Sequence, residues 1–431
     1  MAQIVRKYTQ QKLFISGFII IILSWAVSAT TQKTLWAPTS PLAPENRLWK
    51  LYIATIQARN LQSRIVHIAE NLPSSATPAP VIPKDKQVSG SFCILHIGES
   101  VRSDHLSLFG YSKQTTPNLD KRTNIIAYRD CISVAPSTVP SSFAILTNAK
   151  TDIRNQSIDA SLEASCNGIM DVFHALGYQC YAFLNAEQPN NIWGALYEKI
   201  LHKALISSAD KIITLPLGNN SHAQIEQISR QDYSDSRANY FIFINNIGSH
   251  FPFADYNQES PPFVPTSTTA HAENPKHNRE AAEKVLNAYD NTIHYLDDYI
   301  EKLLSQFLGK PYVYLYISDH GDFFGDGGIW LRSGDKQAFF NSPVCQVPFI
   351  LITSKEFEEQ SPHIIHALEQ LRQHQNMSIG QEHIFHTLLG LFGIQSPYYE
   401  EELDLTSDKV QPYTGPHPSR GGKASDGKKW Y

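Results

Sequence analysis

From about residue 90 onward, the sequence alternates short apolar runs with longer segments of helical periodicity. The runs are bounded by turn-forming residues, which is typical of strands buried inside a sheet. They are Phe92–Ile97, Tyr178–Leu184, Tyr240–Asn245, Tyr312–Ser318 and Val347–Thr353. Segments of helical spacing lie between them, for example Leu162–Leu176 and Ala281–Phe307. This alternation predicts an α/β domain with a largely parallel sheet covered by helices on both faces.

The composition is that of a globular protein and argues against a nucleic-acid partner. The chain has 431 residues, of which 42% are hydrophobic, and a formal net charge of −5. Nucleic-acid-binding surfaces need an excess of positive charge, which this chain lacks. No change in composition divides residues 91–410, so we predict a single main domain there.

The amino terminus carries a candidate membrane segment, Leu13–Ala29, which has 17 residues and no charge. That length is at the lower limit for a transmembrane helix. Basic but no acidic residues precede the segment, so the positive-inside rule predicts a cytoplasmic amino terminus and an exported main domain. Residues 1–30 are therefore predicted to form a cytoplasmic tip and membrane anchor. Val27–Ala29 also has the small residues of a cleavage site, so a removable signal peptide is an alternative.

Two further regions are predicted to flank the main domain. Residues 31–90 look like a connector, in which Arg47–Leu72 has the spacing of an amphipathic helix and Ser74–Val88 reads as a linker rich in proline, serine and alanine. Residues 411–431 form a tail that is rich in glycine and basic residues towards its end, and we expect it to be disordered.

The cysteines give no sign of a metal-binding cluster. There are five of them, without a CxxC pair. Cys93, Cys180 and Cys345 fall in strand-like runs and are predicted to be small buried side chains. A disulfide is not excluded, but the sequence assigns no partners.

Side chains with possible chemistry follow several of the predicted strands. Glu99 comes just after the run Phe92–Ile97, Asp319 and His320 follow Tyr312–Ser318, and His250 follows Tyr240–Asn245. Open α/β sheets bind ligands at the carboxyl ends of their strands, where such groups would meet. Taken singly, a glutamate can be a helix cap and a lone histidine is more often structural. A turn rich in hydroxyl groups, Ala135–Ser142, could start a helix or supply a nucleophile.

These residues lie in segments that closely resemble the signature of the bacterial phosphoethanolamine transferases. These are membrane-anchored members of the alkaline phosphatase/sulfatase superfamily, which modify lipid A and other envelope glycans. The resemblance runs in order over roughly residues 90–405. Its segments are Ile97–Tyr111, Thr115–Asp120, Gly248–Pro252, Tyr289–Ile293, Ser318–Gly321 and Gln381–Gly390.

The resemblance implies a fold and a set of roles. The fold would be an alkaline-phosphatase/sulfatase-like sandwich with a central, mostly parallel sheet, preceded here by one transmembrane helix. Glu99, Asp319 and His320 would bind a zinc ion, with Thr138 as the nucleophile on that metal. Thr138 would take phosphoethanolamine from phosphatidylethanolamine and pass it to an acceptor. His250 would contact the transferring phosphoryl group.

Two positions depart from the lipid A enzymes of that family. The loop around Thr138 lacks their run of threonines, so Ser137 and Ser133 are the alternative nucleophiles. Arg332 stands where those enzymes have a further active-site histidine. A guanidinium can hold a phosphate but cannot release a proton or bind zinc, so we expect Arg332 to bind substrate.

The resemblance also implies the partners of the protein, its location and the alternative functions to be considered. It implies a phosphatidylethanolamine donor, an acceptor such as lipopolysaccharide or another envelope glycan, and an inner-membrane anchor with the main domain in the periplasm. One candidate membrane helix is fewer than the lipid A enzymes have. A phosphodiesterase or sulfatase-type hydrolase and a glycerol-phosphate transferase are alternatives of the same superfamily. A non-catalytic domain that binds the envelope is a further one, but it would need the metal ligands to be missing.

Overall fold

The computed structural model describes residues 80–83, 86, 88–148, 168–185, 206–215, 221–251, 253, 260–266, 275–331 and 336–418. The chain divides into two compact units, residues 1–64 and 65–431, and all described residues lie in the second. The predicted membrane segment Leu13–Ala29 and the predicted amphipathic helix Arg47–Leu72 fall outside the described residues. Among the helices that are described, none has the length and apolar character needed to cross a bilayer.

The centre of the fold is an eight-stranded sheet with the strand order β10-β2-β9-β6-β1-β5-β3-β4. Its strands are β1 (Phe92–Gly98), β2 (Ile125–Ile132), β3 (Gln179–Asn185), β4 (Lys211–Leu215), β5 (Tyr240–Asn246), β6 (Tyr312–Ser318), β9 (Gln346–Thr353) and β10 (Ile379–Gly380). A separate two-stranded ribbon pairs β7 (Phe323–Phe324) with β8 (Trp330–Leu331). In the large sheet only β9 pairs antiparallel, with β2 and with β6.

All five predicted strands are confirmed, and the expectation of a largely parallel sheet holds except at β9. Three strands of the sheet were not predicted. β2 carries the polar pair Arg129 and Asp130, at a register shift in its pairing with β9, and this interrupts the apolar run. β4 is an edge strand with mostly exposed side chains, and β10 has two residues. Polar residues interrupt the apolar residues of β2 and β4, and β10 is too short to form a run, so none of the three has the unbroken apolar run by which buried strands are recognised.

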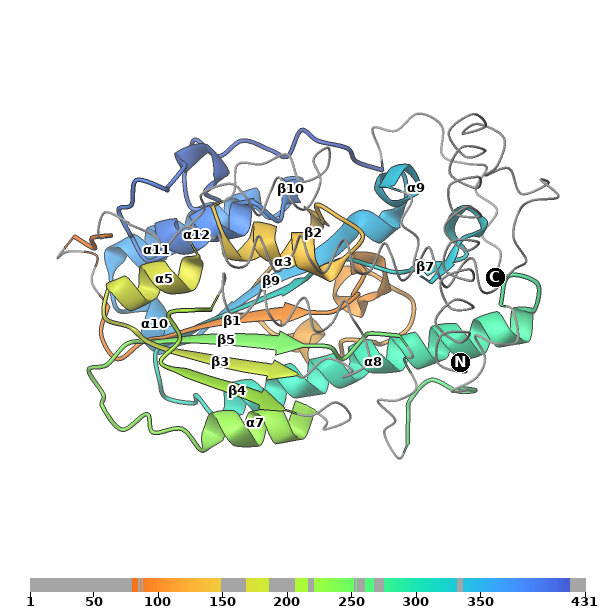
Figure 1. Cartoon of the computed structure of the whole chain (residues 1–431), viewed down its shortest axis with the longest axis horizontal. Helices are drawn as coiled ribbons and strands as arrows, with labels where there is room; N and C mark the ends of the chain where they lie inside the picture. The colour runs from red at the N-terminus through yellow and green to blue at the C-terminus, as the bar shows by residue number, and fades with distance from the viewer. Residues whose placement is uncertain are drawn as a thin grey trace, which may run out of the picture. The chain divides into compact units, whose positions relative to one another are not determined.

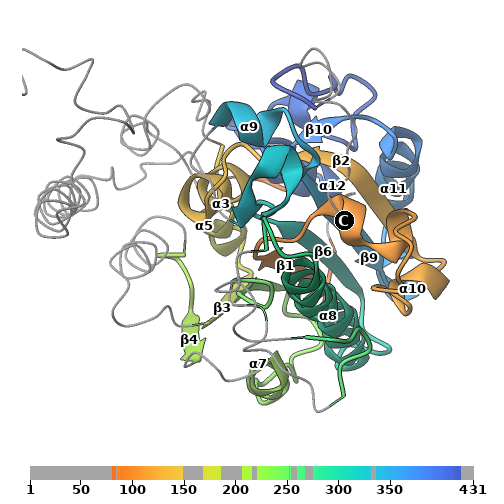
Figure 2. The ribbon, with the colours of Figure 1, turned by 90° about the vertical axis from the view of Figure 1, so that its right-hand side faces the viewer.

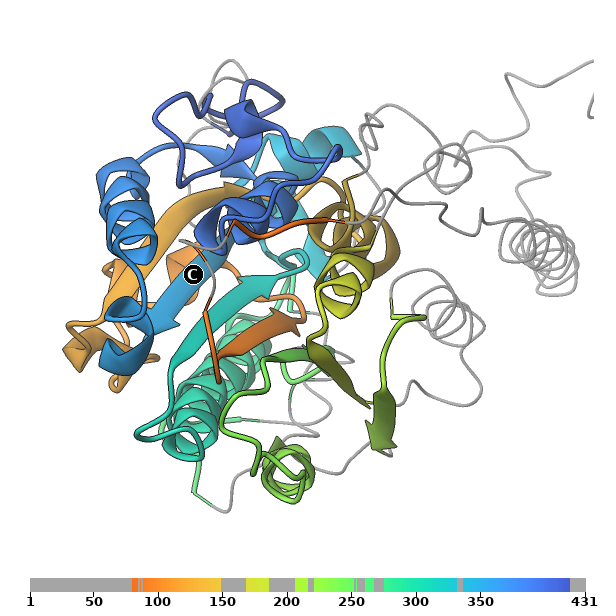
Figure 3. The same ribbon diagram turned by 90° about the vertical axis from the view of Figure 1, so that its left-hand side faces the viewer.

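Helices cover both faces of the sheet (Figures 1 and 2). The helices are α3 (Thr138–Leu146), α5 (Ile169–Ala175), α7 (Ser221–Ser229), α8 (Arg279–Ser305), α9 (Lys336–Phe340), α10 (Lys355–Glu358), α11 (Pro362–His374) and α12 (His383–Leu391). α7 and α8 lie on one face, and α3, α5 and α12 lie on the other (Figure 3). Of the helix predicted at Leu162–Leu176, α5 confirms Ile169–Ala175; Gly168 is the extended residue that caps α5, and residues 162–167 lie outside the described part of the chain.

The long helix α8 owes its position to an apolar stripe. Asn278 caps its first turn by accepting hydrogen bonds from the backbone of Glu280 and Ala281. Its buried side chains then recur at helical spacing, and several of them join the core cluster that also contains Phe92 and Ile94 of β1. The burial of this stripe fixes α8 against the sheet, so its polar side chains can hold neighbouring loops.

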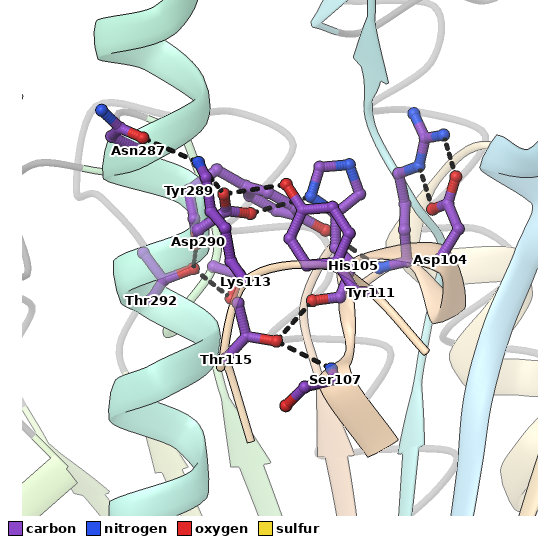
Figure 4. A network of polar contacts seen from close by, with 12 residues as sticks. Asp104, His105, Ser107, Tyr111, Lys113, Thr115, Asn287, Tyr289, Asp290 and Thr292 are labelled. Carbon is purple, nitrogen blue, oxygen red and sulfur yellow. Dashed lines mark hydrogen bonds and ion pairs between the residues drawn. The ribbon is translucent and has the colours of Figure 1, made fainter. Parts of the chain in front are cut away.

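Two acidic side chains of α8, at different points along the helix, hold the loop that follows β1. Asp290 lies between the side chains of His105, Tyr111 and Lys113, at 2.8, 3.0 and 2.6 Å (Figure 4). Further along, Asp297 accepts hydrogen bonds from two successive backbone N–H groups, at residues 118 and 119. The loop from residue 99 to 119 is therefore fastened to a helix that the core holds in place.

The first residues of the predicted carboxyl-terminal tail contact the rest of the domain. Tyr413 is 3% exposed, and its backbone N–H donates to Ser378. His417 pairs with Asp130 at 2.8 Å. The part of the predicted disordered tail from residue 419 onward lies outside the described residues.

The buried carboxylate of Asp297 gives a testable dependence of stability on pH. Burial raises its pKa from 3.8 to about 6. Between these values the folded state holds a proton that the unfolded state has lost, so this group makes the wild type less stable as pH rises. Asp297→Asn should remove that loss. The unfolding free energy of the variant, relative to wild type, should therefore grow by roughly 2–3 kcal/mol across this window.

Denaturant unfolding of both proteins at several pH values measures this difference. Asparagine keeps one accepting oxygen, so the lost hydrogen bond adds a cost that does not change with pH. A difference between the two proteins that stays constant from pH 4 to 6 would contradict the prediction.

Candidate metal centre

The sheet register brings two acidic residues together. β1 and β6 are parallel neighbours, and their last residues, Gly98 and Ser318, are paired. Glu99 and Asp319 follow these paired positions, and the backbone N–H of Asp319 donates to the carbonyl of Gly98 at 3.0 Å. Two carboxylates therefore leave adjacent strand ends side by side.

The predicted trio Glu99, Asp319 and His320 meets at this point. One ligand atom from each residue lies within 4.8 Å of the others. His320 Nε2 is 3.5 Å from Glu99 Oε1 and 3.4 Å from Asp319 Oδ2. Glu99 is 3% exposed, and the other two side chains are fully buried. Of the residues that the structure describes, these three form the one group with the spacing of a metal site.

The charges and donor atoms of this trio favour the binding of a cation. His320 Nδ1 lies 3.1 Å from the carbonyl oxygen of Gly321, to which it can donate, and Nε2 is the nitrogen that faces the two carboxylates. Burial raises the pKa of Asp319, and the charge of Glu99 raises it further. Asp319 Oδ2 receives no hydrogen bond. Two carboxylate oxygens and an imidazole nitrogen around one point are a donor set that suits zinc or a similar divalent ion.

Ser100 connects the two carboxylates. Its backbone N–H donates to Asp319 Oδ1 at 2.9 Å, and its hydroxyl donates to Glu99 Oε1 at 2.8 Å. Ser100 has a φ of +60°, a left-handed backbone conformation that residues other than glycine rarely adopt. Ser100 lies in the segment Ile97–Tyr111, but its role could not be predicted from the sequence, because a positive φ at a residue other than glycine leaves no pattern there.

Thr138 is the predicted hydroxyl that reaches the trio. It is the first residue of α3, half-buried, and its Oγ1 donates to Glu99 Oε2 at 3.1 Å. Ser133 is instead buried and donates to backbone carbonyls, including that of Asp319 at 2.6 Å. Ser137 is the residue before the helix, and its side chain makes no capping hydrogen bond.

Gln381, the first residue of the segment Gln381–Gly390, joins the loop before Thr138 to the loop that carries Asp319. Its amide nitrogen donates to the carbonyls of Ser318 and Asp319, at 2.9 and 2.6 Å. Its amide oxygen accepts from the backbone N–H of Val134 at 3.0 Å. Gln381 directly follows the short strand β10, which β2 and β9 separate from β6 in the sheet, so its side chain and not strand pairing makes this contact.

Two glycines are required here by close approach. A Cβ atom on Gly98 would lie 2.2 Å from the hydroxyl of Tyr316. A Cβ atom on Gly321 would lie 2.5 Å from the carbonyl oxygen of Val344. The strand end before Glu99 and the turn after His320 therefore admit no larger residue without rearrangement.

His250 and Arg332 are the two remaining predicted site residues. His250 lies in the turn after β5, where its backbone N–H donates to Ile247 at 2.9 Å and its Nδ1 contacts the carbonyl of Phe251. Its contacts thus fix the ring in a turn near the same edge of the sheet, and none of them involves the trio. Arg332 lies outside the described residues.

The described cysteines confirm the sequence prediction. Cys93, Cys131, Cys180 and Cys345 are buried and free. Burial raises the pKa of the Cys345 thiol, which favours its inert, protonated form.

Comparison with known proteins places this site in a family. The sequence profile of the sulfatases matches residues 91–394. The phosphoethanolamine transferase EptA of Escherichia coli K12 is 26% identical over 378 residues, which cover 84% of this chain and 63% of the relative. Kdo(2)-lipid A phosphoethanolamine 7''-transferase of the same strain is 21% identical over 321 residues, 72% of this chain and 53% of the relative. The chain therefore spans between half and two thirds of the length of these relatives.

Solved structures show the same fold. The periplasmic domain of EptC from E. coli, in complex with zinc, superposes with a TM-score of 0.62 at 18% identity, covering 81% of this chain and 95% of that one. The integral membrane protein EptA of Neisseria meningitidis gives 0.63 at 20% identity, covering 91% and 70%. The resemblance to phosphoethanolamine transferases is thus confirmed. With most of its length matched by the profile, the chain belongs to the sulfatase family.

Proposed function

We propose that this protein is a zinc-dependent transferase that moves phosphoethanolamine from phosphatidylethanolamine to an acceptor of the cell envelope. Thr138 would carry the phosphoryl group between donor and acceptor. The contact between Thr138 and Glu99 supports this function most directly, because it puts a half-buried hydroxyl against a buried group of metal ligands. The names of the relatives supply the headgroup and the class of acceptor.

The residues of the site would divide the work. Glu99, Asp319 and His320 would hold the zinc ion, whose positive charge lowers the pKa of a hydroxyl beside it. The hydrogen bond to Glu99 orients the Thr138 hydroxyl. Thr138 also opens α3, and the first N–H groups of a helix have no partner within it, so they favour an anion at this place.

The reaction would proceed in two displacements. Thr138 Oγ1 bonds to the phosphorus of phosphatidylethanolamine after losing its proton, the bond from phosphorus to the diacylglycerol oxygen breaks, and diacylglycerol leaves with a proton. An acceptor hydroxyl or phosphate oxygen then bonds to phosphorus, and the Thr138 oxygen leaves and regains a proton. His250 and Arg332 would bind the phosphoryl oxygens, whose charge must be balanced in both steps.

The donor requires access to a membrane. The uncharged segment Leu13–Ala29 would anchor the chain in the inner membrane, with the domain that carries Thr138 in the periplasm. Lipopolysaccharide or another envelope glycan would then be the acceptor, as in the relatives whose names include lipid A.

Thr138→Ala should abolish the covalent intermediate. Full-length protein in detergent, loaded with zinc and incubated with phosphatidylethanolamine, should gain the mass of one phosphoethanolamine group. The alanine variant should bind zinc but show no adduct, with transfer lowered by more than about 10³-fold because the nucleophile is gone. Intact-mass measurement and metal analysis test both points.

Two control variants separate the hydroxyls. Thr138→Ser keeps a hydroxyl nucleophile and should form the adduct. Ser133→Ala should also form the adduct, because the Ser133 hydroxyl is hydrogen-bonded to backbone carbonyl oxygens and does not act as the nucleophile. An adduct on Thr138→Ala would overturn the assignment of the nucleophile. Release of phosphoethanolamine to water, without transfer to any acceptor, would favour the hydrolase. Wild-type protein without bound zinc would contradict the enzyme itself and favour an envelope-binding domain.

Asp319→Asn should have opposite effects on the metal-free and the zinc-loaded protein. Both hydrogen bonds that Asp319 accepts from backbone N–H groups go to Oδ1, so an asparagine can keep them. At pH 8 the raised pKa of Asp319 means that its ionised form costs stability, and the neutral amide removes this cost. The metal-free variant should therefore melt about 2–4 °C above the metal-free wild type.

Zinc should raise the melting temperature of the wild type but not that of Asp319→Asn, because the variant lacks one anionic ligand. Thermal unfolding with and without zinc, after treatment with a chelator, gives the four values. An equal zinc-dependent increase in both proteins would show that Asp319 is not a ligand.

A further inference from the structure

Tyr289 is a buried residue of α8 whose hydroxyl reaches the turn beside Glu99. It is fully buried, donates to the carbonyl of Ser100 at 2.8 Å and accepts from the backbone N–H of Arg102 at 2.9 Å. Burial raises the pKa of Tyr289, so the hydroxyl keeps the proton that it donates. One side-chain group thus satisfies two backbone groups on either side of Val101.

The turn that Tyr289 holds is conformationally unfavourable. Ser100 has a φ of +60°, and a side chain in this region persists only where its surroundings impose it. In this conformation Ser100 directs its N–H to Asp319 and its hydroxyl to Glu99. Rotation of Ser100 back to a negative φ would therefore take away a hydrogen bond from each carboxylate.

We propose that Tyr289 is a positioning residue for the metal centre, an inference that rests on the proposed zinc site. Its hydroxyl holds Ser100 in the left-handed conformation in which Ser100 orients Glu99 and Asp319. Groups that orient metal ligands typically change metal affinity by 10–100-fold when they are removed. Tyr289 would exert this effect from a helix, through the backbone of the loop.

The hydroxyl can be removed without removing the ring. The Tyr289 ring packs against Phe324, Phe253 and His105, with centroid distances of 4.4, 5.1 and 5.1 Å. Tyr289→Phe keeps these contacts and deletes the two hydrogen bonds to the turn. The neighbouring Asp290 still fastens the loop through His105 and Lys113. The substitution therefore tests the turn at Ser100 separately from the rest of the loop.

Tyr299 offers a matched control on the same helix. It is 2% exposed, and its hydroxyl donates to Gln224 at 2.9 Å and not to the backbone of the turn. Tyr299→Phe deletes a buried hydroxyl from α8 just as Tyr289→Phe does. Effects of a general loss of stability should appear in both variants, whereas effects on the metal centre should appear only at Tyr289.

The test is zinc affinity, measured on full-length wild type, Tyr289→Phe and Tyr299→Phe by competition with a chromogenic chelator. We expect a zinc dissociation constant 10–100-fold higher for Tyr289→Phe, and the wild-type value for Tyr299→Phe. Cobalt(II) in place of zinc should give an altered visible spectrum only in Tyr289→Phe, because the absorption depends on ligand geometry. Wild-type affinity in Tyr289→Phe, or equal weakening in both variants, would overturn the inference.

The route through Ser100 is tested by a double-mutant cycle. Glycine adopts a positive φ without strain, so Tyr289→Phe should weaken zinc binding less in a Ser100→Gly background than in the wild type. An equal loss in both backgrounds would show that Tyr289 does not act through this conformation. Failure of the wild type to bind zinc is a different result, which would remove the proposed function and this inference with it.

Discussion

The approach of two buried carboxylates, Glu99 and Asp319, is the constraint on which this structure depends. The pairing of Gly98 with Ser318 fixes it, because the residues that follow paired strand ends must lie side by side. Burial and the charge of Glu99 raise the pKa of Asp319, and His320 lowers it only in part. A bound cation relieves this repulsion, so the fold itself creates the demand that a metal ion would meet.

Thr138, the proposed nucleophile, reaches this point by a different route. Thr138 follows β2, which is separated from β6 by the antiparallel strand β9, so no ladder of backbone hydrogen bonds joins the two loops. Side chains replace the ladder. Ser133 and Gln381 both donate to the carbonyl of Asp319, at 2.6 Å each. Their small polar groups set how far α3 lies from the carboxylates, which explains why a buried serine and a buried glutamine occur at this edge of the sheet.

The sequence predicts the strands and the acidic ligands because both depend on local patterns. Phe92–Ile97 and Tyr312–Ser318 are uninterrupted apolar runs, and polar residues directly after such runs in an α/β domain fall at the ligand-binding edge. β2 escapes prediction because Arg129 and Asp130 break its pattern at a bulge. The roles of Ser100, Gln381 and Tyr289 also escape it, since they rest on contacts between residues 62 to 247 positions apart. Spacing along the chain carries no information about such contacts.

The proposed site would serve both transfer and hydrolysis, and the two reactions would differ in which oxygen displaces Thr138 from the phosphoryl group. The trio and the Thr138 hydroxyl would be needed for the proposed first displacement in either case. Thr138 is half-buried, so water as well as an acceptor can approach it. A transferase must therefore favour its acceptor through groups that bind the acceptor and hold it in line with the phosphorus, because proximity raises the rate of one attack over the other. Those groups lie outside the trio, and for this reason the metal ligands identify the family more readily than they identify the acceptor.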